Sequence, residues 1–278
     1  MIRMSKSKIK GLLHVHTNLS HDGKNSLKEM VDRLRAYGFN FCIITDHYED
    51  LDYYKYMWLK NEIDKIHREK KDFIIILGVE IPYKNAHVIA FPFKKWIKID
   101  YHKKFSREEV ARLRNVADII ILAHPTKFNY LGYLEILPIV DGYEIWNAKA
   151  DGIHTPNIKF IKFISKHEIF DKKIKYVGMD LHDIKFPLVL YLEVINVETL
   201  DSQKIIQLLK EGNFINKSSN HVLRLRGSDS VNNIVITPSI VLRYYIFSIT
   251  RKFLKILYKP FKRFGFAEKV KLIIKRHI

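Results

Sequence analysis

Short apolar runs that alternate with helical patterns are the feature that most limits how this chain can fold. Seven runs typical of buried strands occur before residue 180: IKGLLHV, FNFCIIT, DFIIILGV, AHVIAF, ADIIILA, VDGYEIW and KIKYVGM. Buried strands that alternate with helices are typical of a parallel sheet covered by helices. We therefore expect an α/β fold whose sheet is either open or closed.

Helix signals lie between several of these runs. Ser26 and Glu29 form a capping box, and the helix that it starts is expected to end at Gly38. Ser106 and Glu109 repeat the capping spacing and predict the start of another helix. Further helices are expected over residues 51–71, 156–167 and 202–210.

Polar residues stand where the apolar runs stop. They are His14, His16, Asp46, His47, Glu80, His87, His124, Glu144, Asn147, Asp180 and His182. Ligands of α/β folds bind at the carboxyl ends of the strands, so these side chains are expected to share one rim. A single histidine on an apolar run is more often a packed core residue than a ligand, and Asp46 or Asp180 alone is explained as a helix cap or turn residue. Their recurrence at many strand ends is what indicates a metal site.

The donor atoms limit the kind of metal. Imidazole nitrogens and carboxylate oxygens, without a usable thiol, favour Zn, Mn or Fe. Four donors fill one site, so about nine donors indicate two or three ions that share a carboxylate. Closely spaced ions generate hydroxide at neutral pH and bind the oxygens of a phosphoryl centre.

The same residues occur in motifs that resemble those of the PHP (polymerase and histidinol phosphatase) superfamily. The motifs are His14-Val-His16-Thr17, Ser20-His-Asp22-Gly23, Thr45-Asp46-His47, Gly78-Val-Glu80, His87, Ala123-His124-Pro125 and Gly178-Met-Asp180-Leu-His182-Asp183, within about residues 9–215. The resemblance implies a distorted seven-stranded (β/α) TIM-like barrel, a trinuclear metal centre and phosphoesterase activity.

The resemblance also implies a ligand set. His14, His16 and Asp180 would bind one metal; Glu80 would bridge two; Asp22, His47 and His182 would bind another; His87 and His124 would complete the third. The distance in sequence from His14 to Asp22 is one residue longer than in the commonest form of the motif. His21 therefore remains an alternative, and Asp22 is preferred because Asp-Gly usually ends the motif.

The hypothesis that follows is attack of a metal-bridging hydroxide on a phosphate ester of a nucleotide, oligonucleotide or other small substrate. Glu80 would set the metal separation, and His47 or His182 are the candidates to protonate the leaving oxygen. Asp46 and Asp183 are candidates to orient imidazoles. Lys127, Lys149 and Asn147 are the candidate substrate-binding residues. Two alternatives are a histidinol-phosphate phosphatase and a non-catalytic, metal-stabilised binding module.

The positive charge is concentrated near the C-terminus. Of the formal net charge of +18, residues 240–278 contribute +10, because they hold eleven Lys or Arg and one acid, Glu268. We expect a metal-binding barrel over residues 1–220 and a basic, partly helical extension over residues 221–278. Such a charge asymmetry indicates an anionic partner, either nucleic acid or a membrane surface.

Residues 245–259 of this extension predict an amphipathic helix. Its apolar face comprises Ile246, Ile249, Phe253, Leu254 and Leu257, and its basic face comprises Arg251, Lys252, Lys255 and Lys259. Pro260 is expected to end or kink it. Three interpretations stay open: a helix docked on the barrel, an interfacial helix on anionic lipid, and a nucleic-acid contact with stacking by Tyr258, Phe261 and Phe264.

The composition indicates in which cellular compartment the protein is expected. Cys42 is the single cysteine, so an internal disulfide is excluded and a reducing cytoplasm is the expected location. The longest apolar runs are too short for a membrane-spanning helix, and the apolar run near the N-terminus is too short for a secretion signal.

Overall fold

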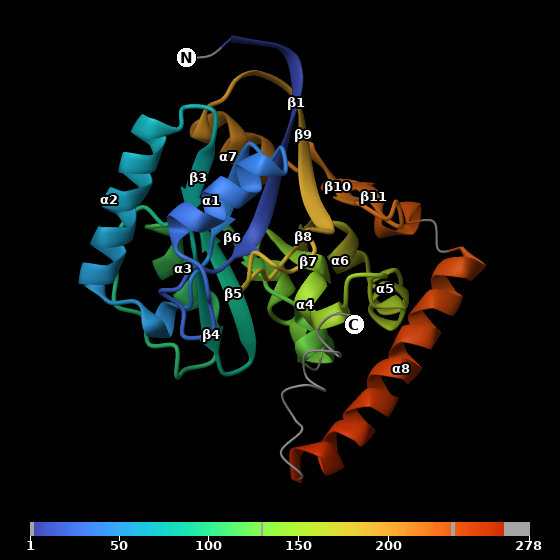
Figure 1. The fold of residues 1–278 in the computed structure, drawn as a ribbon. Coiled ribbons are helices and arrows are strands. Elements are labelled where there is room, and N and C mark those ends of the chain that lie inside the picture. Colours follow the sequence, from blue (N-terminus) through green and yellow to red (C-terminus); the bar gives the residue numbers. More distant parts are fainter. Residues whose placement is uncertain (1–2, 129, 235–236, 264–278) are drawn as a thin grey trace.

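The computed structural model describes residues 3–128, 130–234 and 237–263. This part of the chain is a mixed α/β fold with two mixed sheets (Figure 1). The strands are β1 (Arg3–Val15), β2 (Phe41–Ile44), β3 (Ile74–Leu77), β4 (Val79–Tyr83), β5 (Ala86–Phe91), β6 (Ile119–Leu122), β7 (Gly142–Asn147), β8 (Ile174–Gly178), β9 (Leu190–Thr199), β10 (Phe214–Ser218) and β11 (Arg224–Arg226).

The helices connect these strands and cover the sheets. The α-helices are α1 (Leu27–Ala36), α2 (Tyr53–Glu69), α3 (Arg107–Arg114), α4 (Ala148–Asp151), α5 (Ile158–Ile164), α6 (Glu168–Asp171), α7 (Ser202–Lys210) and α8 (Pro238–Arg263). Short 3-10 helices are η1 (Tyr48–Asp50), η2 (Pro125–Lys127), η3 (Tyr130–Leu134), η4 (Leu137–Ile139) and η5 (Val231–Asn233).

The capping signals mark helix starts as expected. In α1 the Ser26 side chain accepts from Glu29 N, and the Glu29 carboxylate accepts in return from Ser26 N, which confirms the capping box. Helices α3 and α7 also begin where expected, and Asp52 caps α2. The single helix expected over residues 156–167 is shorter: α5 ends at Ile164 and the short α6 follows.

The two sheets contain parallel and antiparallel pairs. The first has the order β11-β10-β9-β1-β2-β3, in which β1, β2 and β3 are parallel and the remaining pairs are antiparallel. The second has the order β4-β5-β6-β7-β8, and its last three strands are parallel. The central strands of both sheets are apolar and buried, and Cys42 lies in β2 as a buried free thiol.

Isolated bridges join the two sheets at two seams. Val15 pairs with Leu181 at one seam, and His47 pairs with Glu80 at the other. Continuous strand ladders do not close into a barrel within the described residues, so the barrel expectation is confirmed only as a mixed α/β fold. Both seams lie beside candidate metal ligands, and at the Val15–Leu181 seam left-handed backbone at His14 and Asp180 interrupts regular pairing, as described below.

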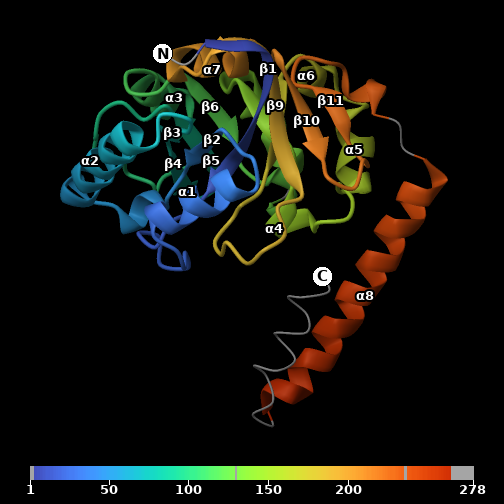
Figure 2. The same cartoon turned by 45° about the horizontal axis from the view of Figure 1, so that its top comes forward.

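Helix α8 projects from the rest of the fold (Figures 1 and 2). It confirms the expected helix and continues through Pro260 to Arg263, so Pro260 does not end it, and a kink at Pro260 stays a prediction. Residues 264–278, which include Phe264, lie outside the described residues, as do the side chains from residue 251 onward. No helix in the described ranges is both long and apolar enough to cross a bilayer.

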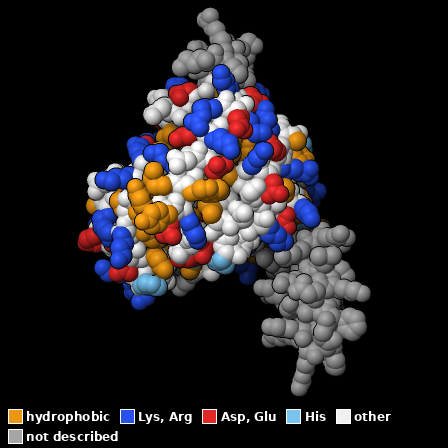
Figure 3. Space-filling model, turned by 60° about the vertical axis from the view of Figure 1, so that its left-hand side comes forward, with side chains coloured by type: hydrophobic (Ala, Val, Ile, Leu, Met, Phe, Trp, Pro, Cys, Tyr) orange, Lys and Arg blue, Asp and Glu red, His pale blue; other side chains and the backbone are white. Residues whose placement is uncertain are grey.

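Apolar side chains also reach the surface on the side of the molecule that carries α2. Figure 3 shows them gathered among Lys and Arg side chains, and the large exposed ones on this helix are Tyr53, Tyr54 and Trp58. Among the described residues, large exposed apolar side chains thus lie on α2, on α8 and at Tyr37, next to the end of α1.

Candidate metal centre

The structure brings all nine predicted metal ligands into one cluster at the strand ends. Four groups of side chains have ligand atoms within 4.8 Å of one another: His16, His47 and His182; His14, Glu80 and His124; His14, His16 and Asp180; and His21, Asp22 and His47. His87 joins the cluster through its Nδ1 atom, 2.9 Å from Glu80 Oε1. The third group is the one that the family resemblance assigns to a first metal.

Glu80 is the centre of the cluster. This carboxylate on β4 is 1% exposed, and five imidazoles surround it. Its Oε2 atom lies 3.3 Å from His14 Nε2, 3.4 Å from His16 Nε2 and 3.1 Å from His47 Nδ1, and its Oε1 atom lies 2.8 Å from His124 Nε2 and 2.9 Å from His87 Nδ1. Nitrogen neighbours on both oxygens would allow this carboxylate to be shared between ions, which is the role that the family resemblance implies for it.

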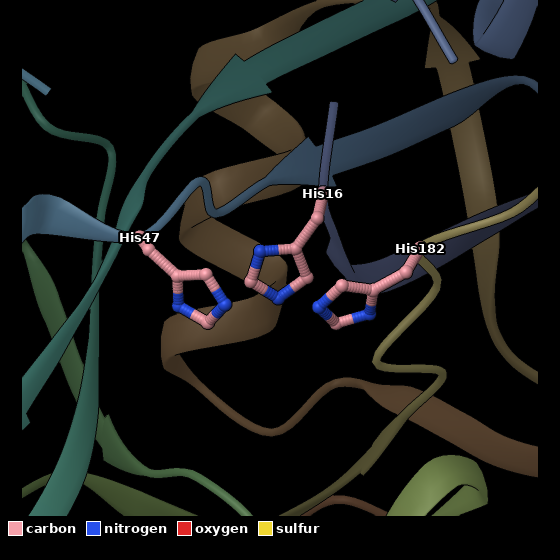
Figure 4. A group of neighbouring side chains, drawn as sticks. All are labelled: His16, His47 and His182. Carbon is pink, nitrogen blue, oxygen red and sulfur yellow. The ribbon is translucent and has the colours of Figure 1, made fainter. Parts of the chain in front are cut away.

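Three imidazoles from distant parts of the chain form one side of the cluster (Figure 4). His16 follows β1, His47 follows β2 and His182 follows β8. The ring centre of His16 is 4.0 Å from that of His182 and 4.4 Å from that of His47, so His16 lies between them. Residues at or next to both bridges between the sheets therefore place their rings in one group.

Asp22 lies against the same imidazoles. Its Oδ1 atom is 3.0 Å from His182 Nε2 and 3.3 Å from His47 Nε2. His21, the alternative at this position, is mostly exposed and its Nδ1 atom donates to Asp50 Oδ2 at 2.7 Å. The contacts favour Asp22 over His21, although His21 also belongs to one of the four groups.

Ser20 sets the tautomer of His16. Its hydroxyl donates its single hydrogen to Asp46 Oδ1 at 2.7 Å, so the Ser20 oxygen is the acceptor for His16 Nδ1 at 3.3 Å. The proton of a neutral His16 therefore resides on Nδ1, and the lone pair of Nε2 points toward Glu80 and Asp180. A hydrogen bond that orients the second ring nitrogen is typical of metal-bound histidines.

Glu144 orients His14, and sequence reasoning did not assign it this role. Its Oε1 atom accepts from His14 Nδ1 at 2.8 Å, and its Oε2 atom accepts from His124 N at 2.6 Å. Gly178 makes room for this carboxylate, because a Cβ atom there would lie 1.7 Å from Glu144 Oε1. The sequence signal for this role was an acidic residue within the apolar run VDGYEIW, because a buried carboxylate requires hydrogen-bonding or charged partners.

The two acids that were expected to contact imidazoles do not orient them directly. Asp46 acts through Ser20 and also accepts from Thr17 N and Thr17 Oγ1, both at 2.7 Å. Asp183 accepts from Lys24 Nζ at 2.8 Å near the surface. Neighbouring side chains along an extended chain point to opposite sides, and the side chain of His47 faces the cluster. This explains why the Asp46 carboxylate contacts Ser20 and Thr17 and not an imidazole.

Left-handed backbone occurs at three of the candidate ligands. The φ angles are +68° at His14, +28° at His124 and +51° at Asp180. Non-glycine residues adopt such angles at a cost of about 1–3 kcal/mol, and they persist where the surrounding structure enforces them. The pairing of β1 with β2 shifts register between Leu13 and Val15, at His14, so the turned backbone explains why the strand ladder is irregular there.

Burial and neighbouring charges give the imidazoles different proton affinities. Burial opposes protonation of His14, but the charges of Glu144, Asp180 and Glu80 outweigh it and raise its pKa well above the usual value. Burial, together with the charge of His14, holds the pKa of His16 well below the usual value. Burial also lowers the pKa of His182, to about 4. His16 and His182 are thus neutral near pH 7, as metal ligation requires.

The three predicted substrate-binding residues differ in position: the two lysines border the cluster, and Asn147 is buried. Lys127 Nζ lies 3.5 Å from Asp180 Oδ2, and Lys149 Nζ lies 3.2 Å from Asp22 Oδ2, so both cations border the cluster. Asn147 is 1% exposed, and its Nδ2 atom donates to Glu144 Oε2 at 2.8 Å while its Oδ1 atom accepts from Ala150 N. This geometry favours a positioning role for Asn147 over the expected contact with substrate.

The donor set fits divalent metal ions. Among the described residues, His16 Nε2, His124 Nδ1 and Asp180 Oδ2 are buried without a hydrogen-bond partner. Buried polar atoms are nearly always satisfied, so unpaired donor atoms on residues of this cluster fit the binding of an ion. Nitrogen and oxygen donors of this type suit Zn, Mn or Fe, and the buried groups can hold more than one ion.

Comparison with known proteins identifies the family of this chain. A family model described as PHP domain matches residues 13–176. This segment contains seven of the nine predicted ligands, and Asp180 and His182 follow shortly after it. No curated protein matches the chain.

Proposed function

Because this chain belongs to the PHP family, we propose that it is a metal-dependent phosphoesterase. The observation that carries the proposal is the buried Glu80 carboxylate, surrounded by five imidazoles and bordered by two lysine ammonium groups. Imidazole and carboxylate donors suit the ions that activate water, and lysines beside them supply attraction for a phosphate.

The family resemblance assigns the residues that would hold the ions, and all of these residues lie in the cluster. His14, His16 and Asp180 would hold one ion, Asp22, His47 and His182 a second, and His87 and His124 a third, with Glu80 shared between ions. Divalent ions, when bound, lower the pKa of water and stabilise negative charge on phosphoryl oxygens. Glu144 and Ser20 keep the rings of His14 and His16 in the orientation that ligation needs.

The exposure of the cations indicates the side from which substrate arrives. The side chains of Lys127 and Lys149 are 40% and 41% exposed, whereas that of Glu80 is 1% exposed. Both lysines can therefore exchange a carboxylate partner for oxygens of an incoming phosphate. A terminal phosphate on a nucleotide, an oligonucleotide or another small molecule suits this arrangement, because the substrate is held by its phosphate and the rest stays in solvent.

The pKa values restrict the proton donor. Burial lowers the pKa of His182 to about 4, so this ring is neutral near pH 7 and has no proton to give to a leaving group. In the metal-free protein the pKa of His47 is raised, because hydrogen bonding and charge from Glu80 outweigh the effect of burial. Both rings are assigned as metal ligands, which must bind as neutral imidazoles, so neither is assigned as the proton donor. Near neutral pH, His182 serves better as a ligand than as an acid.

The test combines metal titration with a substrate panel. Protein loaded with Mn or Zn is assayed with an aryl phosphate, nucleotides, 3′,5′-bisphosphates, sugar phosphates and histidinol phosphate. We expect hydrolysis of at least one phosphate ester, and its loss in His14→Ala and Asp180→Ala, which stay folded by circular dichroism. The matched control His102→Gln changes an exposed histidine outside the cluster and should keep full activity. Metal binding without hydrolysis of any panel member would favour the non-catalytic module, and full activity in Asp180→Ala would refute the assignment of ligands.

A further inference from the structure

One side of α8 contacts the rest of the protein. Phe247 stacks on His154 with ring centres 3.8 Å apart, Tyr244 Oη donates to Asn157 Oδ1 at 3.4 Å, and Ile240 is 9% exposed. The spacing of 240, 244 and 247 places these three residues on one face of the helix. The first half of α8 is therefore held against the segment that joins α4 and α5.

The opposite face of α8 is apolar and exposed. Leu242, Tyr245, Ile246 and Ile249 are 61%, 48%, 53% and 66% exposed. They follow the spacing i, i+3, i+4, i+7, which gives a continuous apolar stripe along a helix. Leu242 and Ile249 each follow a body-contacting residue by two positions, about 200° around the axis, so the stripe faces away from the protein body. Burial against the fold thus does not explain these side chains.

The charge of the helix restricts what can cover this stripe. Residues 238–263 contain seven Lys or Arg and no Asp or Glu, and residues 264–278 add four more basic residues and one acid. A second copy of α8, or the segment that follows it, would bring like charges together. Nucleic acid would neutralise the cations but would gain little from exposed leucine and isoleucine side chains. Anionic lipid satisfies both features, because its headgroups attract the cations and its acyl chains accept the aliphatic stripe.

We propose that α8 is an interfacial helix that binds this protein to the surface of anionic membranes. Leu242, Tyr245, Ile246 and Ile249 enter the boundary between headgroups and acyl chains, and the basic residues pair with lipid phosphates. The contacts of Phe247 and Tyr244 keep the first half of the helix attached to the fold, so the metal-binding body is held near the bilayer. This interaction is independent of the proposed catalysis.

The test measures binding of the full chain to vesicles. Sedimentation with phosphatidylcholine vesicles is compared with sedimentation with vesicles that also contain phosphatidylserine. We expect binding to the anionic vesicles only, weakened by added salt. The variant Leu242→Ser/Ile246→Ser/Ile249→Ser should bind about tenfold or more weakly, because three exposed aliphatic groups are lost. The matched control Tyr54→Ser removes an 81% exposed side chain from α2 and should bind as the unchanged protein does.

The same experiments also test whether the triple variant folds and whether α8 binds nucleic acid or a second copy of the chain instead of lipid. Circular dichroism and metal affinity of the triple variant should equal those of the unchanged protein, since α8 lies outside the metal cluster. Equal vesicle binding by the triple variant would overturn the proposal. So would binding of single-stranded oligonucleotides without vesicle binding, or a dimer that the triple variant loses while vesicles are not bound. Because vesicle binding needs no hydrolysis, its failure and the failure of the proposed activity are distinguishable.

Discussion

A methyl group at position 178 is expected to displace the carboxylate that orients His14. The Cβ atom of an alanine there would lie 1.7 Å from Glu144 Oε1 and 2.5 Å from its Cδ atom. Atoms that are not bonded do not approach so closely, so the Glu144 side chain must move. Glu144 is 1% exposed, and the space around it is filled by protein, so it cannot move into solvent.

The magnitude follows from the hydrogen bonds that the movement breaks. Glu144 Oε1 accepts from His14 Nδ1 at 2.8 Å, and Oε2 accepts from His124 N at 2.6 Å and Asn147 Nδ2 at 2.8 Å. One hydrogen bond to a charged group contributes about 1.5–3 kcal/mol, and leaving a buried charge without its partner costs about 3–5 kcal/mol. We expect Gly178→Ala to lower the free energy of unfolding by about 3–5 kcal/mol. Metal affinity should fall about 10–100-fold, because His14 loses the group that fixes its ring.

Urea unfolding of the metal-free protein and calorimetric metal titration measure both effects. Gly132→Ala is the control, since a methyl group there meets nothing within 4 Å and should change neither quantity. The collision itself is tested in a double-mutant cycle with Glu144→Ala, which removes the carboxylate. In that background Gly178→Ala should be nearly neutral. The reasoning fails if Gly178→Ala destabilises the Glu144→Ala protein as much as it destabilises the unchanged one.

Two further predictions concern titration and thiol chemistry. The pKa of His182 in the folded protein is about 4, below its value of 6.5 in an unfolded chain, so this ring contributes stability that is present above about pH 6.5 and lost as the pH falls toward 4. Metal-free His182→Asn should therefore show a shallower fall of unfolding free energy across this window, and an unchanged slope would contradict the prediction. Burial raises the pKa of the Cys42 thiol and shields it, so an aromatic disulfide reagent should modify no thiol in the folded protein and one after denaturation. Rapid modification under native conditions would show that β2 is accessible.

The convergence of the candidate ligands was predictable, because the carboxyl ends of parallel strands meet at one edge. His14, His47, His124 and Asp180 all stand at such ends, and the structure places them together. The α/β class followed from the alternation of buried runs with helices, and the capping box located the start of α1.

Other features depend on tertiary contacts that periodicity does not encode. Glu144 lies within an apolar run, and only its distance to His14 and the missing side chain of Gly178 show what it does. Asn147 stands at a strand end as the ligands do, but both of its polar groups are engaged within the protein. At Pro260 the sequence left two outcomes open, an end or a kink, and the extension of α8 to Arg263 excludes the end, because a local rule about proline does not include the rest of the helix.

The location of the seams has a mechanical consequence for the whole fold. His16 follows β1 of the first sheet and His182 follows β8, the last strand of the second, and the sheets are joined near these residues only by an isolated bridge. An ion held by both rings would act as a cross-link between segments that are far apart in sequence, which restricts the unfolded chain as well as the native one.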